Sequence, residues 1–131
     1  MMMYLWVGLG SALGGIGRYW VSGVVAGLVG ETFPWGTIAV NVVGSFAIGL
    51  FATVTGPDGR ILVAPEARQF FMLGVFGGFT TFSSFSLQTL NLARDGDWLL
   101  ATANIAVSVA ACLAAVVLGL FAGNAFNQVR G

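Results

Sequence analysis

The chain has 131 residues, of which 57% are hydrophobic and only 8% charged, and its five arginines and five acidic residues give a net charge of zero. Soluble domains carry about 25% charged residues, so this composition excludes a soluble globular domain and predicts an integral membrane protein. A neutral chain also gives no reason to expect a nucleic acid as partner.

Four stretches are long and apolar enough to cross a bilayer, since a transmembrane helix needs about 20 mainly apolar residues. The start of the chain has neither a basic segment nor an Ala-x-Ala-like cleavage site, so we expect no cleaved signal peptide. We therefore expect an all-α membrane protein with one four-helix transmembrane domain, residues 1–131. The predicted spans are residues 3–29, 33–54, 69–93 and 98–126.

The arginines barely distinguish the two sides of the membrane. Arg60, Arg68 and Arg130 fall on the side of the chain ends and the long loop between the second and third spans, whereas Arg18 and Arg94 fall with the other two turns. This difference is too small for the positive-inside rule to select an orientation. Two interpretations stay open: a single, weakly set orientation, and a dual topology in which copies insert both ways and pair antiparallel.

Glycines four residues apart recur along three of the spans and allow helices to approach closely. Four thin helices hardly enclose an ion path alone, so we also expect the chain to form oligomers. The pairs are Gly10 and Gly14, Gly23 and Gly27, Gly74 and Gly78, and Gly119 and Gly123.

The third span is interrupted at its centre, within GVFGGFTTFSSFS at residues 74–86. Gly77, Gly78, Thr80 and Thr81 are poor helix formers. A break at membrane depth frees backbone groups, and it persists only where the backbone lines a cavity or binds an ion. We therefore predict that this stretch is the functional centre.

The freed carbonyl oxygens at this break suit a cation. They adjoin the C-terminal end of a half-helix, which carries partial negative charge. With no carboxylate in the spans, a monovalent cation is favoured over a divalent one. In an antiparallel pair the two breaks would meet on the two-fold axis, where four carbonyls, two per chain, would hold one Na+.

Uncharged polar side chains form stripes along the second and fourth spans. Residues four apart share a helix face. A buried amide must be hydrogen-bonded, so Asn41 is either a link between helices or part of a pore lining. The stripes comprise Thr37, Asn41 and Ser45 in the second span, and Asn104, Ser108 and Cys112 in the fourth.

Phe82 and Phe85 follow the break and alternate with serines. An aromatic ring has a positive edge, so two rings that present their edges can contact a small anion without a fixed charge. Hydroxyl and amide donors then replace its water without trapping it. Arg18 either extends to the interface or draws anions into a vestibule, and the two roles are compatible.

Three motifs resemble the CrcB/Fluc family of bacterial fluoride channels: GGIGRYW at 14–20, WGTIAVNVVGSFAIG at 35–49 and GVFGGFTTFSSFS at 74–86. The resemblance implies a dual-topology homodimer that spans the bacterial cytoplasmic (inner) membrane in several passes. It also implies two parallel pathways through which fluoride leaves the cytoplasm passively, which relieves its toxicity.

The resemblance further implies roles for individual residues. Asn41 matches the pore amide, and Phe82 and Phe85 match the rings whose edges contact fluoride. The Cys112 thiol departs from the hydroxyl expected at its position and is a weaker donor. The remaining implied positions are the carbonyls of Gly77 and Thr80 for a structural, non-transported Na+, the hydroxyls of Thr37, Ser83, Ser84 and Ser108, and Arg18 in the vestibule.

Our prediction is thus a fluoride channel and not an enzyme. The first alternative is a small multidrug-type exporter of dual topology, but proton coupling needs an intramembrane carboxylate or histidine, and the spans contain neither. The second alternative is a non-transporting membrane assembly subunit. It accounts for the spaced glycines but not for the broken helix with its phenylalanines and serines.

Overall fold

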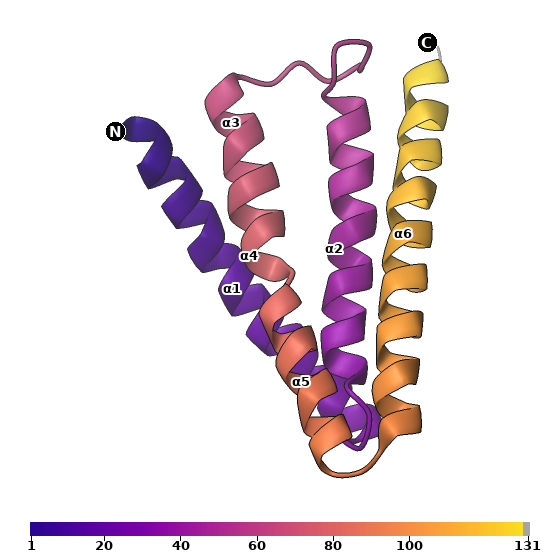
Figure 1. Ribbon diagram of the computed structural model, residues 1–131. Helices are drawn as coiled ribbons and strands as arrows, with labels where there is room; N and C mark the ends of the chain where they lie inside the picture. The colour runs from indigo at the N-terminus through magenta and orange to yellow at the C-terminus, as the bar shows by residue number, and fades with distance from the viewer. Residues whose placement is uncertain (130–131) are drawn as a thin grey trace.

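The computed structural model describes residues 1–129, and every element in them is helical (Figure 1). Four helical segments are long and apolar enough to cross a membrane: α1 (Met2–Val29), α2 (Trp35–Val54), a composite third helix (Pro65–Arg94) and α6 (Trp98–Gln128). The composite helix bends near its middle. These observations confirm the prediction of an all-α, multi-pass membrane protein whose third helix is broken.

The composite third helix is interrupted slightly later than the sequence indicated. Gly77 and Gly78 remain helical, and the backbone becomes extended at Thr80 and Thr81, with ψ angles of 158° and 114°. Extended backbone suits β-branched residues, whereas the two glycines are free to continue a helix. The segments in chain order are α3 (Pro65–Gln69), the π-helix η1 (Phe70–Phe76), α4 (Gly77–Phe79) and α5 (Phe82–Arg94).

Two predicted helix starts differ from the observed ones by two residues or more. The third helix starts at Pro65, four residues before the predicted start of its span, because a proline at the first position and Glu66 behind it suit a helix N-terminus. The second helix begins at Trp35, directly after Pro34 at its N-cap position. Neither shift moves a candidate site residue out of its helix.

Glycines let the helices approach closely in two separate pairs. A Cβ atom at Gly14 of α1 would collide with the carbonyl of Val75, and one at Gly74 would lie 2.9 Å from the Cα atom of Gly10. A Cβ atom at Gly119 of α6 would collide with a carbonyl of α2. Accordingly, α1 packs on η1 and α4, while α2 packs mainly on α6. The Gly23 and Gly27 pair has no such neighbour within 4 Å among the described residues.

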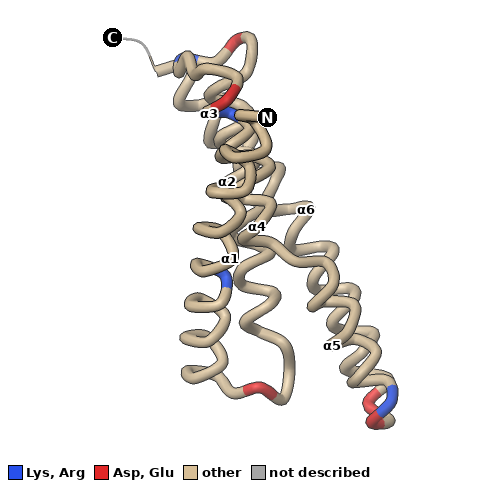
Figure 2. The backbone as a smooth tube through the Cα atoms, turned by 90° about the vertical axis from the view of Figure 1, so that its left-hand side faces the viewer, with Lys and Arg blue, Asp and Glu red and all other residues tan. Residues whose placement is uncertain are grey.

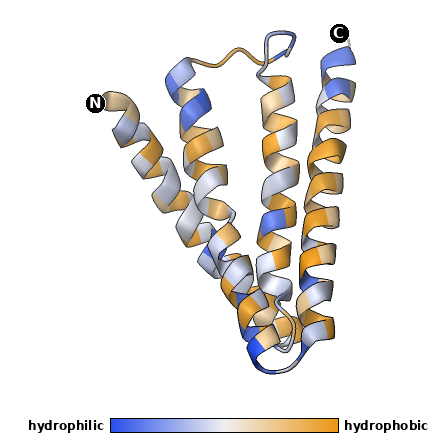
Figure 3. Cartoon of the chain, viewed as in Figure 1, coloured by the Kyte–Doolittle hydropathy of each residue, from blue (hydrophilic) through white to orange (hydrophobic). Residues whose placement is uncertain are grey.

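Charged residues gather at the two ends of the molecule, with one arginine partway along α1 (Figure 2). That residue is Arg18, which lies eleven residues before the end of α1 at Val29, or about 16 Å along the helix axis. The comparison of charges on the two sides grouped Arg18 with a turn, but Arg18 lies inside the helix. Arg130, which was also counted in that comparison, lies outside the described residues. Hydrophobic residues dominate α2 and α6, and α5 is more polar (Figure 3).

Candidate functional site

The extended backbone in the third helix is held by one side chain of α2. The Nδ2 atom of Asn41 donates a hydrogen bond of 3.0 Å to the carbonyl oxygen of Thr81, and the amide nitrogen of Thr81 donates one of 2.7 Å to Oδ1 of Asn41. A single side-chain amide thus satisfies both backbone groups of Thr81. An unsatisfied buried group would cost about 1–3 kcal/mol, so Asn41 is the partner that permits the break.

A glycine allows α2 to come this close to the break. Gly44 lies one helical turn after Asn41, and a Cβ atom there would overlap the methyl group of Thr80. The Thr80 hydroxyl turns back and donates a hydrogen bond of 3.1 Å to the carbonyl oxygen of Phe76. The break is therefore fixed by side-chain contacts on one face and by its own helix on the other.

Two carbonyls at the break lose the N–H groups that would bond them in a regular helix. The N–H group of Thr81, which would bond the carbonyl of Gly77, bonds Asn41 instead. The N–H group of Ser84, which would bond the carbonyl of Thr80, bonds the Thr81 hydroxyl at 3.2 Å. Gly77 and Thr80 are the two positions that the sequence predicted as carbonyl ligands of a cation.

Three hydroxyls cluster at the start of α5. Oγ1 of Thr81 lies 3.2 Å from Oγ of Ser83 and donates a hydrogen bond of 3.2 Å to Oγ of Ser84. Because Thr81 also accepts the bond from the Ser84 N–H group, it is the N-cap residue of α5. The cluster orients the first turn of α5, which carries the phenylalanines.

A cavity of about 320 Å³, here called the aromatic cavity, lies beside the break. Phe82 and Phe85 line it with ring centroids 5.3 Å apart and ring planes inclined at 53°. Phe82 is 78% exposed at the surface of the protomer, so the cavity is open on the side of this ring. The other lining residues that the sequence singled out are Asn41, Ser45, Gly77, Thr80, Ser108 and Cys112.

Ser108 reaches the aromatic cavity from a buried hydrogen-bonded chain. Its hydroxyl donates a hydrogen bond of 3.1 Å to Oδ1 of Asn104, and Nδ2 of Asn104 donates one of 2.9 Å to the hydroxyl of Thr89 on α5. Asn104 is only 1% exposed. It links α5 and α6, and the Ser108 proton is engaged in this link, so an anion in the cavity would have to compete with Asn104 for it.

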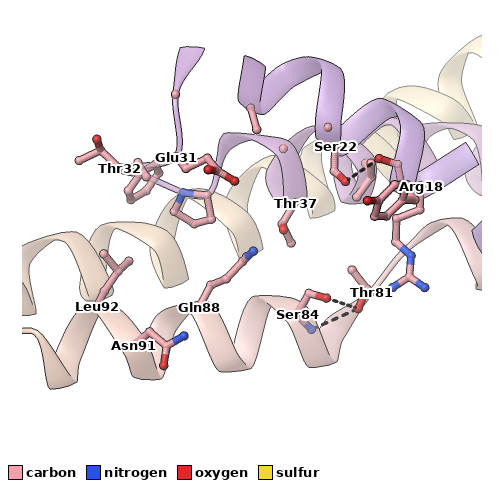
Figure 4. Close-up of a pocket in the computed structure, with 18 of the residues that line it drawn as sticks. Arg18, Ser22, Glu31, Thr32, Thr37, Thr81, Ser84, Gln88, Asn91 and Leu92 are labelled. Carbon is pink, nitrogen blue, oxygen red and sulfur yellow. Dashed lines mark hydrogen bonds between the residues drawn. The ribbon is translucent and has the colours of Figure 1, made fainter. Parts of the chain in front are cut away.

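A second cavity of about 610 Å³, here called the entrance cavity, lies on the other side of the break (Figure 4). Arg18, Thr37 and Ser84 line it, and Figure 4 shows Arg18 at the same end as Thr81. The acidic residues Glu31 and Asp95 line it from the two turns at the end of the molecule. An anion entering here would pass the acidic turns and reach Arg18, the one basic residue among the described residues that line this cavity, at its inner end.

Three residues of this region were not among the predicted site residues. Thr81 lines both cavities, and Asn104 connects Ser108 to α5. Gln88 lines the entrance cavity with its amide directed toward Thr37 (Figure 4), and its buried Oε1 atom has no hydrogen-bond partner among the described residues. Gln88 could have been found from the sequence, because residues three and four apart share a helix face. Thr81, Ser84 and Gln88 have this spacing.

The predicted residues thus divide between the two cavities. Thr37 and Asn41 share a face of α2 but line different cavities, and the extended segment meets α2 at Asn41 and Gly44. Ser83 lines neither cavity and instead contacts the Thr81 hydroxyl.

Comparison with known proteins identifies close relatives over the whole chain. Residues 5–120 match the family model described as CrcB-like protein, Camphor Resistance (CrcB). A protein of Opitutus terrae named fluoride-specific ion channel FluC is 60% identical over 131 residues, covering 100% of this chain and 99% of its own. Proteins of the same name from Methylocella silvestris and Paramagnetospirillum magneticum are 57% and 59% identical, covering 99% and 98% of this chain and 99% and 100% of their own.

We expect Asn41→Ala to lower the melting temperature of the detergent-solubilised protein. The substitution leaves both backbone groups of Thr81 without partners, at a cost of roughly 2–6 kcal/mol for two unsatisfied groups. Hydrogen exchange at the Thr81 amide should accelerate in the same variant, because that N–H group loses its acceptor.

Asn124→Ala, at an exposed position of α6, is the matched control and should leave both measurements close to wild type. If Asn41→Ala melts as Asn124→Ala does, the Asn41 amide does not hold the break together.

Proposed function

The chain belongs to the CrcB-like protein family, and from this premise we propose that it is a fluoride-selective ion channel, a channel rather than an enzyme. Its named relatives are fluoride-specific ion channels. The observation that carries the proposal is the aromatic cavity, in which an amide, hydroxyls and two phenyl rings adjoin a non-helical backbone segment. Irregular backbone at membrane depth is tolerated where it lines a cavity.

The donors in this region suit a small, strongly hydrated anion. Such an ion leaves water only where other dipoles replace its shell, and it leaves the site again only if no fixed charge traps it. Thr37 and Ser84 offer hydroxyls in the entrance cavity, and Ser108 offers one in the aromatic cavity. The positive edges of Phe82 and Phe85 add attraction without a full charge.

Arg18 attracts anions to the entrance cavity. Its guanidinium is half-buried and lines the entrance cavity, where it raises the local concentration of anions. It does not line the aromatic cavity, so the contacts that an ion would make there remain uncharged. Fluoride then moves down its electrochemical gradient, out of the cytoplasm when the inside concentration is higher. This passive export relieves fluoride toxicity.

We further propose a structural Na+ at the break, held by the carbonyls of Gly77 and Thr80. Both carbonyls have lost their helical N–H partners to Asn41 and to the Thr81 hydroxyl. Neutral carbonyl oxygens suit a hard monovalent cation, and no group of three or more His, Cys, Asp or Glu side chains that could hold a metal occurs among residues 1–129. A bound Na+ would supply positive charge where the end of α4 carries partial negative charge.

The functional unit that we propose is an antiparallel, dual-topology homodimer in the bacterial inner membrane. Gly77 and Phe82 are both exposed on the protomer surface, although one is a candidate cation ligand and the other a candidate pore residue. A second copy against this face would complete both sites, and an antiparallel copy would bring two breaks together on the symmetry axis.

The multidrug-type exporter remains the weaker alternative, because the one carboxylate within the four long helices of residues 1–129 is Glu66, which is exposed in the first turn of α3 and not placed to couple protons to transport at membrane depth. A non-transporting subunit would not require a cavity that continues from the polar break to two phenyl rings. The flux experiment below separates all three functions.

Wild-type protein in liposomes should release fluoride with an electrical current and should release far less chloride. Phe82→Ile and Phe85→Ile should each lower fluoride flux by at least about tenfold, equivalent to about 1.4 kcal/mol of barrier, because an aliphatic group lacks the positive ring edge. Fluoride-electrode recordings measure both effects.

Phe121→Ile, at an exposed position of α6 outside both cavities, provides the same substitution as a control and should conduct normally. Unchanged flux in both cavity variants would remove the rings from the pathway.

Replacing Na+ by a large organic cation at constant ionic strength should lower the melting temperature of the protein and loosen the dimer. A ligand bound only by the folded state stabilises it by about 2.7 kcal/mol at 100 times its dissociation constant. Melting curves at graded Na+ concentrations measure the effect, and an identical melting temperature in the organic-cation buffer would refute the site.

Reporter fusions at the C-terminus should find it on both sides of the membrane in comparable amounts. Reversal of a single charged residue should shift this balance. Asp97→Lys, in the turn before α6, and Asp58→Lys, in the loop after α2, should shift it in opposite directions. A C-terminus on one side only, unmoved by either change, would contradict the antiparallel pair.

A further inference from the structure

Thr81 stands between the two cavities. Of residues 1–129, it is the one residue that lines both the entrance cavity and the aromatic cavity. It is 8% exposed, and the two hydrogen bonds to Asn41 fix its backbone from both sides. Thr81 therefore marks the place where the two cavities adjoin along this chain.

The Thr81 hydroxyl has more neighbours than it has protons. Oγ1 accepts from the N–H group of Ser84, contacts Oγ of Ser83 and donates to Oγ of Ser84. A hydroxyl has a single O–H donor, which rotates about the C–O bond to suit its partner. Since Asn41 fixes the backbone, the Thr81 proton can be redirected without any movement of the chain.

We propose that Thr81 is the residue by which fluoride crosses from one cavity to the other, with its hydroxyl proton turning from Ser84 to the ion. This inference rests on the proposed fluoride channel. The exchange replaces a bond between neutral groups by a charge-assisted one, which is roughly twice as strong. The Ser84 hydroxyl keeps its own proton and serves the ion on the entrance side.

The same hydroxyl also caps α5, so the test has to separate capping from ion contact. Loss of a Thr cap costs about 1 kcal/mol, whereas Gly at the cap position costs only a few tenths relative to Thr. Thr81→Gly thus removes the proton donor and largely spares the cap. Thr81→Val removes both at nearly constant volume, and Thr81→Ser keeps both.

Fluoride efflux should fall by about tenfold or more in Thr81→Gly and Thr81→Val, a loss of about 1.4 kcal/mol or more in barrier terms. Thr81→Ser should stay within about threefold of wild type, which is under about 0.7 kcal/mol. The fluoride concentration for half-maximal flux should rise in the Gly variant, because a lost donor weakens ion contact. A purely structural defect lowers the maximal flux and leaves that concentration unchanged.

Thr102→Val is the matched control, because Thr102 is exposed on α6, lines neither cavity and, within residues 1–129, has its side chain bonded only to the carbonyl of Trp98. It should conduct as wild type. Normal flux in Thr81→Gly, or an unchanged half-maximal concentration, would overturn the inference while the channel function stands. A wild type that moves no fluoride would overturn the channel function itself. If Thr81→Val fails to fold, the Gly and Ser variants decide the question.

Discussion

A backbone that leaves the helix inside a membrane must find hydrogen-bond partners, and here they come from the side-chain amide of Asn41. One amide has a donor and an acceptor side by side, which match the carbonyl and the N–H group of an extended residue. Asn41 binds both groups of Thr81 in this way. Without such a pair the apolar surroundings would favour a continuous helix through Thr80 and Thr81, and no cavity would open beside the break.

Close helix packing holds the break within hydrogen-bonding distance of that amide. Gly44 lets the side chain of Thr80 lie against α2, and Gly10 and Gly14 let α1 support the other face of η1 and α4. Cβ atoms at these positions would push the helices apart. The high glycine content therefore positions the helices, because it brings two backbones close enough for a short side chain to bridge them.

The site achieves its polarity almost without charge. Among the residues that line the aromatic cavity, the polar groups are amide, hydroxyl and thiol, and Arg18 lies in the other cavity. A fixed charge in the aromatic cavity would hold an anion too strongly for rapid release, whereas neutral donors and ring edges would exchange easily with its water. The buried network through Asn104 and Thr89 would limit such an exchange, because the Ser108 proton already has a partner.

The sequence alone determined the membrane class, the four spans, the broken third helix and the residue types of the site, since length, hydropathy and residues poor in helix propensity are local properties. It also identified Asn41 as a residue that needs a partner, but not which one. The tertiary structure decided that Thr81 is the partner, that Thr37 and Asn41 line different cavities, and that Ser83 lines neither. Arg18 lies inside α1, as the predicted span 3–29 already implied, and not with the turn with which the charge comparison grouped it. The physical reason is that periodicity reports which residues share a face of one helix, whereas the partner across from that face depends on how closely neighbouring helices pack at their glycines.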